Sequence, residues 1–296
     1  MSEAQQKYQF YKYHPSTVIA AIVTALFGLS SAIHLFQLLR KRTWYFIPFF
    51  CGCLLETIGY GARSINASKT PHWTLVVYII ETLFILLAPA LLAASIYMVL
   101  GRIVRLFDAG HLSLVSPRWL TKLFVFGDIL SFVTQLAGGG ILASADDKKM
   151  NDVGKYVILV GLAIQIIFFG FFFIVIIAFH QRIQREPTPM STDADIPWRS
   201  SIFVLYTVSA LILVRSVFRV VEYAMGKDGV LMSNEVYIYI FDALLIFICV
   251  ALFNIRHPSR IVLANKQTKA NKRTKTNKMK MSKDVPLESV SRHTVV

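Results

Sequence analysis

The sequence predicts an all-α membrane protein with seven transmembrane helices, and three observations support this prediction. First, 55% of the 296 residues are hydrophobic and 16% are charged, whereas about 25% of residues are charged in a typical soluble domain. Second, seven stretches approach the roughly 20 apolar residues that a helix needs to cross the hydrocarbon core. Third, Lys and Arg gather in alternate connections between these stretches, which is typical of a protein with several spans.

The seven expected spans differ in how clearly the sequence marks them. The fifth, YVILVGLAIQIIFFGFFFIVIIAF, is uninterrupted, whereas the second and the sixth contain charges. The N-terminal stretch lacks the basic region and small-residue cleavage site of a signal peptide, so we expect the first span to remain as a signal anchor. In chain order, the expected spans are residues 17–39, 45–63, 75–100, 121–144, 156–179, 201–224 and 236–255.

The distribution of basic residues predicts the orientation. Of the 31 Lys and Arg residues, 21 lie in or beside the connections after spans 1, 3 and 5 and in the tail, seven lie on the other side, and three lie within spans. This bias puts the N-terminus outside and the C-terminus in the cytosol. We expect an extracellular segment over 1–16, a transmembrane domain over 17–258 and a basic, disordered cytosolic tail over 259–296. The net charge of +14 is then mainly a topology signal, and we expect no nucleic-acid partner.

Ionisable residues interrupt several expected spans, and their spacing places them on shared helix faces. Positions seven apart in an α-helix point in nearly the same direction. Pairs with this spacing are Glu56 with Arg63, Asp128 with Gln135 and Arg215 with Glu222. Ser131 lies on the same face as Asp128, and Arg219 lies on the same face as Arg215. Since charges at this depth rarely face lipid, each set is expected to point into the helix bundle.

Two interpretations of these residues stay open. One is a network of intramembrane ion pairs that fixes helix order, with the candidates Arg63, Arg215, Arg219 and Glu222. The other is a path for a substrate or for protons, with the candidates Glu56, Glu81, Asp128, Ser131, Gln135 and Asp242. Five acids accompany three arginines, so the interior has two surplus negative charges and favours a cation or a proton. We therefore expect amphipathic amines to suit this path.

Glycine and proline give a second indication of function. Gly127 and Ser131 form a small-xxx-small spacing that lets helices approach closely. Three glycines, Gly138, Gly139 and Gly140, are expected to weaken the outer end of span 4, and Pro89 is expected to kink span 3 and free a carbonyl. Such helices line transporter sites, although they also serve packing alone. Echoes between spans 2–3 and 6–7 suggest a parallel repeat of three spans, one linker span and three spans.

Other sequence features limit the classes of function. Asn66 begins a glycosylation sequon, NAS, on the predicted outer side. The cysteines Cys51, Cys53 and Cys249 lie in apolar segments and suit neither a disulfide framework nor a zinc site. The chain has no phosphate-binding GxxxxGK[ST] motif, no HExxH and no GxSxG. We expect no enzymatic activity, no metal and no cofactor.

Six motifs occur in an order that resembles the fungal RTA-like family, also called lipid-translocating exporters. They are ETIGYGAR, LLAPALLAASIYMVLGR, FGDILSFVTQLAGGG, GLAIQIIFFGFFF, LVRSVFRVVEYA and YIFDALLI. The resemblance covers roughly residues 10–258. It implies seven spans, a fungal source, resistance to toxic amphiphiles and outward movement of lipids such as sphingoid long-chain bases. It also implies a plasma-membrane location, with the vacuolar and endoplasmic reticulum membranes as alternatives. It assigns no catalytic residue.

Two other functions fit the same topology. A seven-helix sensor or receptor would share the outer N-terminus and inner tail, but the chain lacks a DRY motif after span 3, where it has GRIVR, and lacks NPxxY in span 7. A regulator of lipid asymmetry that transports nothing is the third hypothesis. The expected partners of the leading hypothesis are membrane lipids and amphipathic, cationic small molecules.

Overall fold

A computed structural model describes residues 13–70, 72–144, 147–189, 191, 198–226 and 229–258. This part of the chain is helical and contains no β-strand. Seven helical stretches are long and apolar enough to cross a membrane, which confirms the predicted fold class. The described residues begin within the predicted extracellular segment, at Tyr13, and end with Pro258, the last residue of the predicted transmembrane domain. The whole predicted tail, residues 259–296, therefore lies outside the described residues, as do residues 1–12.

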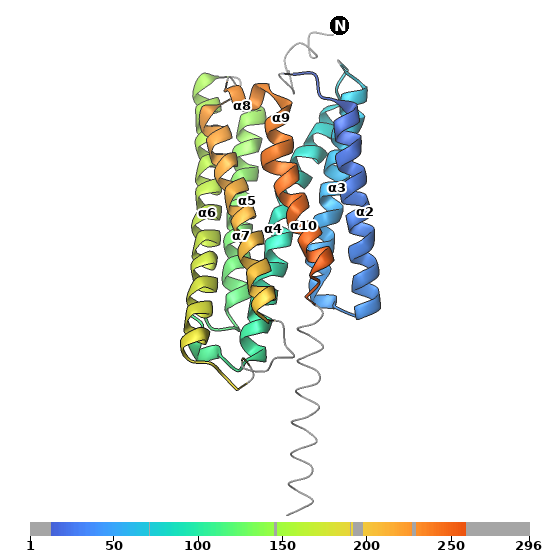
Figure 1. The fold of residues 1–296 in the computed structure, drawn as a ribbon. Coiled ribbons are helices and arrows are strands. Elements are labelled where there is room, and N and C mark those ends of the chain that lie inside the picture. Colours follow the sequence, from blue (N-terminus) through green and yellow to red (C-terminus); the bar gives the residue numbers. More distant parts are fainter. Residues whose placement is uncertain are drawn as a thin grey trace, which may run out of the picture.

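The first six spans are single continuous helices, apart from a short 3-10 turn that opens the second (Figure 1). They are α2 (Thr17–Lys41), η1 with α3 (Trp44–Phe46 and Ile47–Ser68), α4 (Leu75–Leu106), α5 (Leu120–Ser144), α6 (Lys148–Arg185) and α7 (Trp198–Met225). A short 3-10 turn, η2 (Gly110–Leu112), lies in the connection after α4. Several helices are longer than the predicted spans, because their charged ends continue beyond the apolar stretch.

The seventh span is built from three consecutive helical pieces. It follows a one-turn helix, α8 (Val230–Ser233), and consists of α9 (Glu235–Ile238), the π-helical segment η3 (Tyr239–Leu244) and α10 (Leu245–Ile255). A π-helix is wider than an α-helix, is rare and is frequent at functional sites. The predicted limits of this span are confirmed, but its irregular centre has no signal in the hydrophobic pattern.

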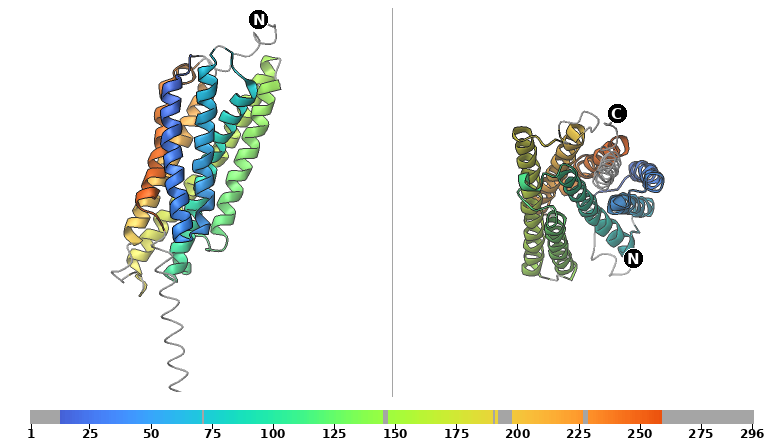
Figure 2. Two further views of the ribbon diagram at one scale, coloured as in Figure 1. Left: turned by 90° about the vertical axis from the view of Figure 1, so that its right-hand side faces the viewer. Right: turned by 90° about the horizontal axis from the view of Figure 1, so that it is seen from below.

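The bundle is organised around α4. Its span has the largest buried share of the seven, and it packs against α3, α5 and α7. Seen along the bundle, α2 and α3 lie on one side of α4, and α5 and α6 lie on the other (Figure 2). The last span closes the arrangement, because α10 contacts both α7 and α2.

Side-chain contacts fix this closure and the ends of the helices. His34 Nε2 of α2 lies 3.2 Å from the carbonyl oxygen of Val250 in α10. Gln37 Nε2 donates to the carbonyl of Asn254 at 3.0 Å. Large apolar side chains that remain exposed, such as Phe36 on α2, suit contact with lipid tails. The start of α2 and the end of α10 lie at opposite ends of the bundle, as an odd number of spans requires (Figure 1). Orientation and internal repeat remain predictions.

Candidate functional site

An ion pair lies between α7 and the π-helical segment at the centre of the bundle. Arg215 Nε donates to Asp242 Oδ1, and both side chains are almost completely buried. Arg215 Nη2 also donates to the carbonyl oxygen of Ile85 on α4 at 3.1 Å. That carbonyl has no intrahelical partner four residues later, because Pro89 has no amide hydrogen. The carbonyl that Pro89 was expected to free thus accepts a hydrogen bond from the buried arginine.

Glu56 lies beside this pair, and no described residue forms a hydrogen bond or an ion pair with it. Its side chain, on α3, is 1% exposed, and neither carboxylate oxygen has a hydrogen-bond partner among the described residues. The nearby charges that act on it are those of Asp242, Arg215 and Arg219. Arg215 is neutralised by Asp242, and Arg219 by Glu222, whose Oε2 accepts from Arg219 Nη1 at 2.8 Å. Glu56 therefore leaves one negative charge in excess at this point.

The residues around Glu56 can accept further hydrogen bonds. Tyr60, one turn along α3, is fully buried, and its hydroxyl has no hydrogen-bond partner among the described residues. The charges of Asp242 and Glu56 both act on this hydroxyl. The second oxygen of Asp242, Oδ2, is likewise buried and unpaired. An ionised carboxylate without a partner is costly at this depth, so the arrangement favours a cation or a proton at Glu56. We call Glu56, Tyr60, Arg215 and Asp242 the central cluster.

A second cluster surrounds Arg63 at the end of the bundle near the N-terminal segment. Arg63 Nη1 donates to Glu81 Oε1 of α4 at 2.6 Å, and Nη2 donates to Glu235 Oε1 of α9 at 3.1 Å. Nη2 also donates to the Tyr13 hydroxyl at 2.6 Å, and Nε donates to the Tyr239 hydroxyl at 3.2 Å. Burial raises the pKa of the Tyr13 hydroxyl despite the opposing effect of Arg63. These five residues, the terminal cluster, join α3, α4, span 7 and the N-terminal segment.

Sequence reasoning missed three members of the terminal cluster: Tyr13, Tyr239 and Glu235. A signal for Glu235 existed, because it precedes Asp242 by seven residues, the spacing that identified the other polar faces. Tyr13 and Tyr239 had none, since a tyrosine near a membrane interface is common. The structure also assigns Glu81 and Asp242 to ion pairs, although the sequence had suggested them for the substrate path.

Asp128, Ser131 and Gln135 all face inward, Asp128 toward α4 and the other two toward α6. The Asp128 side chain is 6% exposed and lies beside the hydroxyl of Tyr97 on α4. Its Oδ2 has no hydrogen-bond partner among the described residues, and no arginine pairs with it there. Ser131 Oγ donates to the Gly161 carbonyl of α6 at 2.7 Å, and Gln135 Nε2 donates to Ser131 Oγ at 2.6 Å. Ser131 and Gln135 therefore connect α5 to α6, and Asp128 remains as an unpaired acid.

Two glycines of α5, Gly127 and Gly138, pack closely against α6, whereas Gly139 and Gly140 do not. A Cβ on Gly138 would lie 2.7 Å from Ile158 Cγ1 and 2.9 Å from the carbonyl oxygen of Gly154, both in α6. Gly127 likewise has no room for a Cβ, because the ring of Phe168 occupies the space. No described atom other than the helix backbone lies within 4 Å of a Cβ on Gly139 or Gly140. Helix α5 continues through these glycines to Ser144. That they weaken this end of the helix stays a prediction.

The same substitution at adjacent glycines is expected to have opposite effects on stability. Gly138→Ala forces a methyl group against the backbone of α6 and should destabilise the protein by about 1–3 kcal/mol. Gly139→Ala adds its methyl group to open space and should stabilise the helix by up to about 1 kcal/mol, because alanine is the better helix former. Thermal unfolding of the two purified variants in detergent measures both effects. Equal shifts of the two midpoints would contradict the close approach of α5 and α6.

Asn66, the sequon residue, has a structural role in this conformation. Its side chain is 0% exposed, its Oδ1 accepts from the Thr74 amide at 3.1 Å, and its Nδ2 donates to the Thr74 carbonyl at 3.5 Å. These bonds hold the connection between α3 and α4. Glycosylation at Asn66 stays a prediction.

The comparison with known proteins agrees with this membrane architecture. The family model described as "RTA1 like protein" matches residues 49–265. Protoporphyrin uptake protein 1 of Saccharomyces cerevisiae is 40% identical over 210 residues, which cover 71% of this chain and 67% of the relative. Protein RTA1 of S. cerevisiae is 32% identical, with 86% of each chain covered. Sphingoid long-chain base transporter RSB1 of S. cerevisiae is 28% identical, with 79% of this chain and 69% of the relative covered.

No solved structure matches the chain. The family model covers well over half of the sequence, including all but the start of span 2, spans 3–7 and both buried charge clusters except for Tyr13. On this coverage, the chain is an integral membrane protein that belongs to the RTA1-like family.

Proposed function

We propose that the protein is a transporter that moves lipids or other amphipathic compounds across a membrane, with sphingoid long-chain bases as the representative substrate class. The observation that carries the proposal is Glu56, a buried carboxylate at the centre of the bundle that forms no ion pair with any arginine of the described residues. Asp128 is a second acid of this kind. A sphingoid base combines an ammonium group with an aliphatic chain, so its head suits a buried carboxylate and its tail suits lipid.

The names of the relatives support transport and leave the direction to experiment. One relative is named for the transport of sphingoid bases and another for the uptake of protoporphyrin. We propose outward transport, a location in the plasma membrane and no enzymatic activity. Protoporphyrin is an amphipathic dicarboxylic acid, so it serves as a substrate of opposite charge in the test.

Purified protein in liposomes, supplied with a labelled sphingoid base, tests the proposal. We expect translocation by the parent protein and a rate lowered roughly tenfold in Glu56→Gln and in Asp128→Asn, as loss of about 1.4 kcal/mol of interaction would produce. The matched control is Asp152→Asn, which removes an exposed acid near the start of α6. Neither substitution should slow the transport of protoporphyrin, because a carboxylate repels this anion rather than attracting it.

Two other results of this assay would overturn parts of the proposal. Folded parent protein that moves neither compound would overturn the transporter proposal and favour a sensor or a regulator. Normal transport of the amine by the Glu56→Gln and Asp128→Asn variants would overturn the assignment of these acids. If a proton occupies Glu56 during the cycle, transport should also depend on a pH gradient across the liposome membrane.

A further inference from the structure

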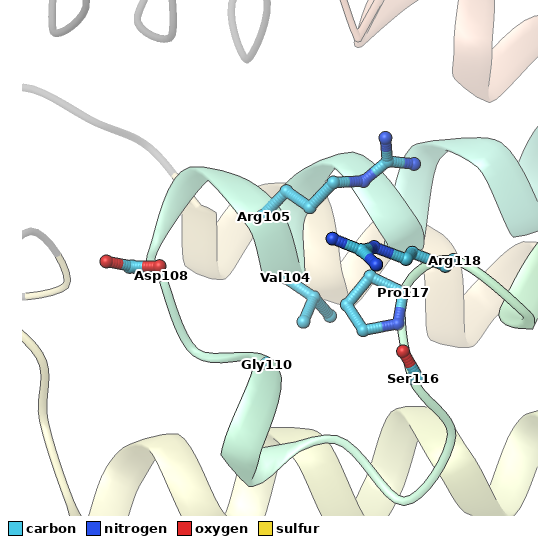
Figure 3. Close-up of a pocket in the computed structure, with 7 residues that line it drawn as sticks. All are labelled: Val104, Arg105, Asp108, Gly110, Ser116, Pro117 and Arg118. Atoms are coloured by element: carbon cyan, nitrogen blue, oxygen red, sulfur yellow. The ribbon is translucent and has the colours of Figure 1, made fainter.

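A hollow of about 370 Å³ lies where α4 ends and the chain turns back toward α5 (Figure 3). Its wall is formed by the last turn of α4, Gly110 of η2 and the segment that precedes α5. The charged residues in the wall are Arg105, Asp108 and Arg118, and Ser116 contributes a hydroxyl. Neither charge cluster described above includes any of these residues. We call this feature the α4–α5 hollow.

The α4–α5 hollow is basic. Arg105 and Arg118 are exposed, and Figure 3 shows their side chains on the same side of the hollow, whereas the Asp108 carboxylate points away from them. Arg105 Nε donates to the Gly101 carbonyl at 2.9 Å, which orients the guanidinium. The charge of Arg102 also acts on this group from one turn earlier. Among the described residues, no carboxylate forms an ion pair with Arg105 or Arg118.

Helix length places this hollow at the level of lipid headgroups. Helix α4 has 32 residues, so it is about 48 Å long, whereas the hydrocarbon core is about 30 Å thick. The last turns of α4 therefore extend past the hydrocarbon. Trp119, next to Arg118, is 65% exposed, and Lys122 Nζ lies 5.3 Å from its ring centroid. An exposed tryptophan beside a lysine is typical of the membrane interface.

We propose that the α4–α5 hollow binds the phosphate of an anionic phospholipid in the leaflet at this end of the bundle. Two guanidinium groups each present paired N–H donors that form strong hydrogen bonds to phosphate oxygens, and the hydroxyl adds another donor. The bound anion would also offset the repulsion among the three arginines. In the predicted orientation, the excess of Lys and Arg puts this end in the cytosolic leaflet, which is rich in anionic lipid. The site is independent of which compound the protein transports.

Lipid binding by the purified full chain tests this site without a transport assay. Phosphatidylglycerol, phosphatidylcholine and inorganic phosphate are added separately to protein in detergent, and bound lipid is counted by native mass spectrometry while the thermal midpoint is recorded. We expect phosphatidylglycerol to bind and raise the midpoint. The variant Arg105→Gln/Arg118→Gln should weaken that binding by roughly tenfold or more, since each basic residue at a membrane surface contributes about fivefold.

The matched control is Arg40→Gln/Arg185→Gln, which removes two exposed charges at the same end of the bundle but outside the hollow. It should bind phosphatidylglycerol as the parent does. Equal loss in both double variants would show attraction by net charge alone and would overturn the site. If phosphatidylcholine raises the midpoint as much as phosphatidylglycerol does, the preference for an anionic lipid is overturned. If inorganic phosphate raises it as much, the site binds phosphate alone and the assignment to a lipid is overturned. The midpoint of each variant without lipid shows whether it is folded.

Discussion

Arg215→Gln is expected to destabilise the protein by about 3–5 kcal/mol, the usual loss when one partner of a buried ion pair is removed. The substitution leaves the Asp242 carboxylate buried without its cation, beside Glu56, which already lacks one. It also leaves the Ile85 carbonyl without its donor, because Pro89 offers no replacement. Thermal or denaturant unfolding in detergent measures the change. A much lower yield of folded protein is the corresponding result in cells.

Three variants separate this explanation from a general effect of losing a charge. Arg199→Gln removes an exposed arginine from the same helix and should change stability little. Arg215→Gln/Asp242→Asn should recover much of the loss, because no unpaired charge remains at the former pair. Pro89→Ala returns an amide hydrogen to the Ile85 carbonyl, so Arg215→Gln should be less damaging in that background. The pairing is contradicted if Arg215→Gln and Arg199→Gln unfold alike.

The central cluster shows how far helical spacing can predict a site. The spacing of seven between Arg215 and Glu222 identifies a face, and the structure shows that this face is buried. Spacing does not determine which neighbouring helix the face meets. The partner of Arg215 is Asp242, which lies in the π-helical segment of span 7. No pattern in the sequence indicates this segment, since a π-helix depends on the contacts around it.

Span limits were more predictable than partners, for a physical reason. The bilayer imposes a length on every apolar stretch, and this length applies to each helix separately. An ion pair depends on the rotation of two helices about their axes and on their relative height, which only the packed bundle determines. Pro89 is an informative exception. The sequence predicted a free carbonyl, because the missing amide is local chemistry, and the structure supplied its donor.

Arg63→Gln is expected to destabilise the protein by about 3–5 kcal/mol and to release the N-terminal segment. The arginine is shared by Glu81, Glu235 and the hydroxyls of Tyr13 and Tyr239. Its removal takes this shared arginine away from Glu81 and Glu235, whose side chains are only 5% and 12% exposed. Tyr13 then loses its hydrogen bond to Arg63 of α3. Hydrogen exchange of the backbone around Tyr13 and Ser16 should accelerate roughly tenfold for each 1.4 kcal/mol lost locally.

Arg63→Lys distinguishes the charge of the terminal cluster from its geometry. Lysine keeps the positive charge, but its compact ammonium group cannot reach four acceptors in the directions that a planar guanidinium serves. We therefore expect intermediate stability together with faster exchange at the N-terminal segment. Full stability in Arg63→Lys would show that charge alone holds the cluster. Unchanged exchange at Tyr13 and Ser16 in Arg63→Gln would contradict the role of Arg63 as their anchor. The Ser16 amide reports on the cluster because it donates to Glu235 Oε2 at 2.8 Å.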